Sequence, residues 1–210
     1  MFSLDRSAVP AFDRRSLHID LSEHLEARHK SDIVLGTSLF APFLPTLDKR
    51  VRDEWGPLLL LYPEALLISV SAQTWTAIGV GRYRPIAYIL EASLSQRMDA
   101  ANRNSFFSGH TTSTATATFF MARVMGDLHP ELGGKRWLLH AGAAVPPALA
   151  GRYRIRAGKH FPSDVITGSV FGAAVGTLVP ELHRRKEVQD LSILPRFSPQ
   201  GIGCSASMRW

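Results

Sequence analysis

Three polar clusters stand at the ends of apolar stretches in this 210-residue chain, and each carries side chains that can bind a negatively charged group. They are Arg84, Ser108-Gly109-His110, and the set Arg154, His160 and Asp164. The planar guanidinium of arginine matches two phosphate oxygens at once. Ser108 and Gly109 stand where a helix would begin, and the free N–H groups of a helix N-terminus bind anions. Together the clusters predict a site for a phosphate-like anion.

The spacing of His160 and Asp164 suits a histidine nucleophile. A carboxylate four residues away can hold one ring nitrogen and leave the other free to attack. His110 can then protonate the leaving oxygen. Two other interpretations stay open. A His–Asp pair at this spacing is also a common helix-end contact. His110, His160 and Asp164 could instead bind a metal, although the spacing of the zinc motifs is absent.

Five apolar stretches surround these clusters and predict an all-α fold, a bundle of about five core helices. The stretches are Ile33–Leu47, Trp55–Gly81, Asn104–Ala122, Trp137–Gly151 and Val165–Pro180. If the helices run up and down with short connections, the three clusters meet at one end of the bundle. This convergence is inferred from topology alone.

The glycines of the last apolar stretch, rather than the lengths of the stretches, indicate whether the bundle lies in a membrane. Three of the stretches hold only 15 or 16 residues, whereas a spanning helix usually needs about 20. Gly168, Gly172 and Gly176 recur every four residues, which is typical of helix packing in membranes. A close crossing of two soluble helices is the alternative. We expect a membrane-embedded bundle.

The two ends of the chain differ from the bundle, which divides the chain into residues 1–30, 31–186 and 187–210. The first part is polar and predicts a surface helix in Ser16–Lys30. The last part alternates apolar and small or polar residues with period two, which predicts a short β-hairpin with Pro195 on its edge strand. A tail without structure is the alternative.

Composition narrows the class of partner. The chain is 45% hydrophobic, carries a formal charge of +6 and has a pI near 9.9. The excess of basic over acidic residues favours an anionic partner. The absence of any nucleic-acid-binding motif argues against DNA or RNA. A single cysteine, Cys204, excludes an internal disulfide and a cysteine-built metal site. No secretory signal is visible at the start.

The three clusters, in this order, resemble the motifs of the type 2 phosphatidic acid phosphatase and vanadium haloperoxidase superfamily. Those motifs are K-x6-R-P, P-S-G-H and S-R-x5-H-x3-D, and this chain reads "AIGVGRYRP", "FSGH" and "YRIRAGKHFPSD". The resemblance implies a phosphohistidine on His160, orientation by Asp164 and protonation of the leaving group by His110. It also implies that Arg84, Arg154, Ser108 and the Gly109 amide hold the phosphate oxygens. No metal or other cofactor is implied.

The chain departs from the family pattern at three positions. Ala77 stands where the family has lysine, Phe107 replaces the proline before the serine, and Tyr153 replaces the serine before the last arginine. Loss of the lysine removes one phosphate contact and puts the catalytic rate in doubt. Arg82 is a candidate replacement.

The resulting expectation is a metal-independent phosphatase that hydrolyses a phosphate monoester or diphosphate of a lipid. One alternative is a non-catalytic, degenerate membrane member of the family, which Ala77 supports. Another is a vanadate-dependent haloperoxidase. The resemblance favours a bacterial inner membrane with the site facing the periplasm. A soluble periplasmic protein is the alternative, and the near-even distribution of Lys and Arg gives no orientation.

Overall fold

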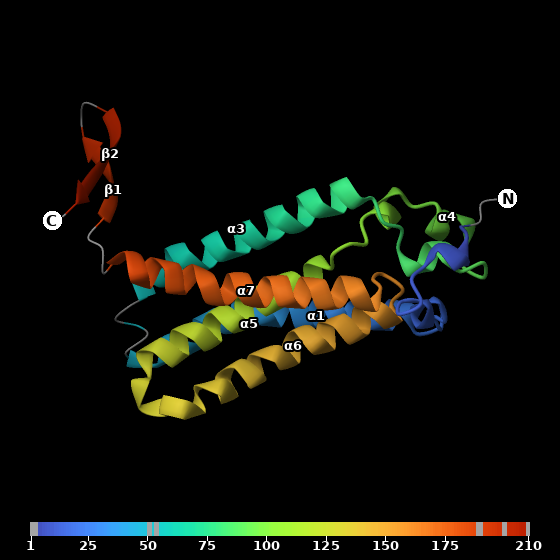
Figure 1. Cartoon of the computed structure of the whole chain (residues 1–210), viewed down its shortest axis with the longest axis horizontal. Helices are drawn as coiled ribbons and strands as arrows, with labels where there is room; N and C mark the ends of the chain where they lie inside the picture. The colour runs from blue at the N-terminus through green and yellow to red at the C-terminus, as the bar shows by residue number, and fades with distance from the viewer. Residues whose placement is uncertain (1–3, 50–51, 53–54, 188–190, 199–200, 209–210) are drawn as a thin grey trace.

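A computed structural model describes residues 4–49, 52, 55–187, 191–198 and 201–208. Among these residues, five long helices lie roughly side by side (Figure 1) and form the all-α bundle that the apolar stretches predict. They are α1 (His24–Phe40), α3 (Trp55–Val80), α5 (Gly109–Leu128), α6 (Arg136–Arg156) and α7 (Pro162–Glu187). A single turn, α4 (Leu94–Arg97), lies in the long connection between α3 and α5.

The predicted surface helix in Ser16–Lys30 is wrong as a separate element. Arg14–Leu17 forms a 3-10 turn, and α1 begins only at His24. The helix then continues into the first apolar stretch, because no proline occurs between His24 and Pro42. It buries Ala27 and Ser31 while contacting α5 and α6. The expected boundary between residues 30 and 31 therefore falls inside one continuous helix.

The glycines of α7 lie against the backbone of α5, as their spacing predicts. A Cβ added at Gly168 would lie 2.6 Å from the Ser108 carbonyl oxygen, and one at Gly176 would lie 2.5 Å from that of Thr116. Only glycine permits so close an approach. Helix α5 also contacts α1, α3 and α6, so it forms the centre of the bundle.

Threonine side chains of α5 link it to two more helices. Thr116 Oγ1 lies 2.7 Å from Ser69 Oγ of α3. Thr118 Oγ1 donates a hydrogen bond of 2.7 Å to the carbonyl oxygen of Ala143 in α6. These bonds satisfy buried hydroxyl groups. The threonine-rich run is therefore a helix whose side chains carry interhelical bonds.

In the part of the chain that the structure describes, two segments are long and apolar enough to cross a membrane, Leu58–Tyr88 and Pro162–Arg184. The first is largely exposed, and the side chains of Leu60 and Trp75 are 76% and 74% exposed. A contiguous exposed apolar surface of this kind is typical of a face that meets a membrane or a partner.

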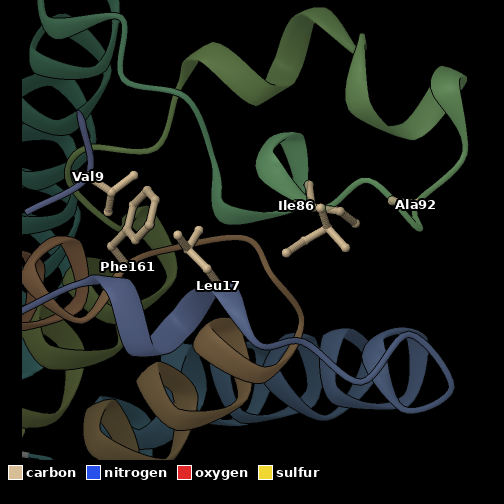
Figure 2. Packing of buried hydrophobic residues seen from close by; sticks show 6 residues of the cluster. Val9, Leu17, Ile86, Ala92 and Phe161 are labelled. Atoms are coloured by element: carbon tan, nitrogen blue, oxygen red, sulfur yellow. The ribbon is translucent and has the colours of Figure 1, made fainter. Parts of the chain in front are cut away.

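At the end of the bundle where the chain begins, an apolar cluster joins three distant segments. Val9 and Leu17 come from the N-terminal segment, Ile86 and Ala92 follow α3, and Phe161 precedes α7. Figure 2 shows the Phe161 ring beside Val9 and Leu17. This cluster packs the N-terminal segment against the loops that carry the polar residues described below.

Beyond α7, the backbone of the last described residues contains β1 (Leu191–Ser198) and β2 (Gly201–Met208), where the sequence predicts a hairpin or a tail. The strands pair antiparallel, with Pro195 opposite Cys204. Figure 1 places them next to the end of α7, far from the N-terminus.

Candidate active site

The three polar clusters of the sequence meet at one end of the bundle. The structure has a cavity of about 350 Å³ lined by Gln73, Thr74, Ala77, Ile78, Arg84, Asn104, Gly109, His110, Arg154 and His160. Backbone bonds hold the clusters together: Ser108 N–H donates to the Asp164 carbonyl oxygen at 3.0 Å, and Ile86 N–H donates to that of Gly158 at 3.1 Å. The topological convergence predicted from the alternation of helices is therefore present.

His160 is 3% exposed, and its ring is held by a backbone carbonyl. Nδ1 lies 2.7 Å from the carbonyl oxygen of Ser105, which can only accept a hydrogen bond. Nδ1 therefore carries the proton, and Nε2 keeps its lone pair. Burial is the main cause that lowers the pKa of His160, Asp164 opposes it, and the charge of Arg154 adds to it. The resulting pKa is about 4. The ring is thus a neutral base at pH 7.

Asp164 does not hold the ring as directly as its spacing predicts. Its nearest oxygen lies 3.8 Å from Nδ1 of His160. The fully buried carboxylate instead accepts bonds from Ser105 Oγ at 2.5 Å and from the Phe161 N–H at 2.8 Å. Ser105 thus contacts both residues, through its hydroxyl and its carbonyl group. Ser105, a residue that no motif spacing identified, therefore links Asp164 to the histidine.

Arg82 lies behind the cavity and does not line it, so it does not occupy the place left by the missing lysine. Its guanidinium donates to Asp164 Oδ1 at 2.6 Å and to Asp13 Oδ2 at 2.7 Å. Asp13 is 1% exposed and also accepts bonds from the N–H and hydroxyl of Ser163. The two carboxylates neutralise Arg82 and leave it no role at the cavity surface. No sequence pattern pointed to Asp13.

Arg84, Arg154 and Ser108 have buried polar atoms that lack hydrogen-bond partners within the described part of the chain. They are Nε of both arginines and Oγ of the serine. Ser108 is the N-cap of α5, yet its hydroxyl makes no capping bond. Unpaired buried polar groups are costly, and a bound anion is one way to satisfy them. These atoms and the first N–H groups of α5 are groups of the kind that bind anions in proteins.

Ala77, at the position of the family lysine, does line the cavity. Another lysine, Lys159, lies next to His160 in the sequence and is partly buried. Burial is the main cause that lowers the pKa of Lys159, and the nearby charges of Arg84, Arg28 and Arg154 add to it. Together they bring this pKa to about 8. Lys159 therefore adds positive charge beside the site from a different element.

His110 contacts a carboxylate that the sequence analysis did not identify. Its Nε2 lies 2.8 Å from Oδ1 of Asp32 on α1. The guanidinium of Arg154 lies 3.8 Å from the same oxygen. Asp32 stands just before the first apolar stretch without a motif around it, so only the packing of α1 against α5 and α6 reveals it. Within the described residues, no group of three or more His, Cys, Asp or Glu side chains is arranged to hold a metal ion.

The fold and this arrangement of histidines and arginines are those of one class of protein. Residues 58–187 match the sequence profile of the PAP2 superfamily. This is more than half of the chain, and the chain belongs to that superfamily.

Similar proteins include lipid phosphatases. The decaprenylphosphoryl-5-phosphoribose phosphatase of Mycobacterium tuberculosis is 29% identical over 136 residues, which cover 59% of this chain and 70% of that protein. The crystal structure of a transmembrane PAP2-type phosphatidylglycerolphosphate phosphatase from Bacillus subtilis is similar with a TM-score of 0.55 and 20% identity, over 83% of this chain and 84% of that one. The Aquifex aeolicus LpxE structure is similar with a TM-score of 0.51 and 22% identity, over 81% of this chain and 92% of that one. At these identities the two structures support the fold alone.

Proposed function

We propose that the chain is a metal-independent phosphatase that hydrolyses a phosphate monoester or diphosphate of a lipid through a phosphohistidine. The observation that carries this proposal is the placement of a buried, neutral His160 in one cavity with Arg84 and Arg154. A neutral imidazole is a nucleophile, and fixed guanidinium groups stabilise the charge that builds on phosphorus in the transition state.

The reaction follows from the contacts. Nε2 of His160 attacks phosphorus while the bond to the leaving oxygen breaks, and His110 gives that oxygen its proton. Water then attacks phosphorus, returns a proton to His110 and breaks the P–N bond. Arg84, Arg154, Ser108 Oγ and the Gly109 N–H bind the phosphate oxygens. Ser105 and Asp164 keep Nδ1 of His160 as the protonated nitrogen, so that Nε2 remains the reacting atom.

A lipid substrate and a membrane location are supported by two observations. The superfamily relatives named above act on lipid phosphates by their names. The Leu58–Tyr88 segment, whose residues contribute to the cavity, presents a largely exposed apolar surface that a lipid bilayer would cover. We place the protein in a bacterial inner membrane with the cavity facing the periplasm, in line with the family resemblance.

Phosphate release from short-chain phosphatidate, phosphatidylglycerol phosphate and polyprenyl diphosphate, assayed in excess chelator, tests the proposal. We expect turnover by the wild-type protein and a loss of at least about 10³-fold in His160→Ala, because no other group replaces the nucleophile. His140→Ala removes a histidine outside the cavity and serves as the matched control. Wild-type protein quenched in alkaline denaturant should retain ³²P on histidine when the substrate is labelled at phosphorus, because phosphohistidine is stable in base and is hydrolysed in acid.

Wild-type turnover that His160→Ala leaves unchanged would contradict this mechanism. A complete absence of turnover would favour the alternative of a degenerate membrane protein, which Ala77 in the cavity wall supports. Bromide oxidation with added vanadate and peroxide would identify the haloperoxidase alternative.

A further inference from the structure

A carboxylate from the first helix reaches the proposed general acid. Asp32 lies on α1, outside the residues that match the superfamily profile. Its Oδ1 is 2.8 Å from Nε2 of His110 and 3.8 Å from the guanidinium of Arg154. The histidine is therefore its principal partner, and the arginine is a second, longer contact.

We propose that Asp32 is a positioning residue that fixes the His110 ring and favours its protonated form, which gives its proton to the leaving oxygen. This inference rests on the proposed function. A carboxylate accepts the Nε2–H bond and favours the imidazolium over the neutral ring. The same bond sets the orientation of the ring, so that Nδ1 is the nitrogen left for proton transfer.

The charges around His110 explain why such a carboxylate is needed. Arg154 comes from α6 and Arg84 from the segment after α3, and both are positive. His160 shares the cavity and is neutral. Asp32 is the negative group that faces the ring. Burial lowers the pKa of His110, Arg154 lowers it further, and Asp32 opposes both. Without Asp32, the two effects that lower the pKa of His110 would act unopposed, so a smaller fraction of the ring would carry the proton at a given pH.

A different role would leave a different kinetic signature. Asp32 is 48% exposed and lies near Arg154, so it could instead occupy the anion site until substrate displaces it. Its removal would then lower KM, because the substrate would no longer compete with it. A positioning role predicts a fall in kcat that depends on pH, with little change in KM.

Three variants separate these roles. In Asp32→Asn we expect kcat to fall at least tenfold at pH 7.5 and less than threefold at pH 5.5, with KM within about twofold of wild type. Asp32→Glu should restore most of the activity and the wild-type pH profile. Glu26→Gln is the matched control, since Glu26 is an exposed carboxylate on the same helix that pairs with Lys30.

A spectroscopic measurement tests the proposal without requiring turnover. The His110 resonance in protein labelled with ¹³C at histidine Cε1 is assigned with His110→Gln and titrated from pH 4 to 9. We expect the midpoint in Asp32→Asn to lie about one pH unit or more below that of wild type. An unchanged midpoint, or a lower KM at every pH, would overturn the proposal. If the midpoint shifts but the protein has no phosphatase activity, the effect of Asp32 on His110 is confirmed and only the proposed function is wrong.

Discussion

The residues that precede the superfamily match supply two carboxylates to the site, whereas the matched residues supply its histidines and its cavity arginines. The matched part, 58–187, contributes the two histidines and the cavity arginines. The preceding part contributes the carboxylates Asp13 and Asp32, which bind Arg82 and His110 respectively. Several cations in one low-dielectric cavity repel one another. The comparison shows that the N-terminal segment balances part of this charge and is a component of the site rather than an appendage.

The two N-terminal carboxylates differ in burial, and this predicts different roles. Asp13 is 1% exposed and bonded on both oxygens, so its loss should act on stability. Asp32 is half-exposed beside the cavity, so its loss should act on proton transfer. If both substitutions had the same effect, this division would be wrong.

Breaking the buried contact of Asp13 should have the largest effect. Asp13→Ala removes the acceptor for Arg82 and for both donors of Ser163. Removing one member of a buried ion pair typically costs about 3–5 kcal/mol. We expect the lower end, about 3 kcal/mol in the free energy of unfolding, because Arg82 keeps its bond to Asp164. Denaturant unfolding in detergent micelles measures this change.

Asp20→Ala is the control for that measurement, because Asp20 is an exposed carboxylate of the same segment that bonds only locally, to Ser22. Its loss should change the free energy of unfolding by less than about 0.5 kcal/mol. Equal effects of the two substitutions would mean that the N-terminal segment does not anchor the Arg82 network.

A smaller loss of stability should follow from a change confined to the matched part. In Gly176→Ala, the new methyl group would lie 2.5 Å from the Thr116 carbonyl oxygen and 2.9 Å from the Phe120 nitrogen. Overpacking of this kind costs about 1–3 kcal/mol. Gly142→Ala is the matched control, because nothing lies within 4 Å of its added Cβ and alanine favours a helix. A Gly176→Ala protein as stable as the control would show that α5 and α7 can separate at little cost.

The sequence predicted the helices and the polar clusters that meet at the cavity because both leave local signals. Apolar stretches bounded by charge marked the five helices, and the fixed spacing of Arg154, His160 and Asp164 marked the third cluster. Helix alternation then sufficed to bring the clusters to one end. The glycines of α7 were also recognisable, since their period of four leaves them on one face of a helix.

The residues that the sequence did not reveal act through contacts between distant segments. Asp13 reaches Ser163 across 150 positions, and Asp32 reaches His110 across 78. Ser105 holds His160 through its carbonyl group, which every residue possesses. Arg82 stands two residues from Arg84, and only the carboxylates around it show that it turns away from the cavity. Such partners depend on three-dimensional packing and leave no pattern in spacing.

The smallest effect concerns Lys159, a cation of the matched part that is repelled by the charge of Arg28 in α1. Burial lowers its pKa to about 8, so the ammonium is charged at pH 7 and mostly neutral at pH 9. If that charge helps to bind the anion, inhibition by tungstate, a dianion across this range, should weaken about threefold between these pH values in wild type. The Lys159→Arg side chain stays charged, so inhibition of this variant by tungstate should weaken less. Lys30→Arg changes an exposed lysine paired with Glu26, and its inhibition should change with pH as in wild type. Identical pH dependence in wild type and Lys159→Arg would show that the lysine adds nothing to anion binding and that Arg84 and Arg154 suffice.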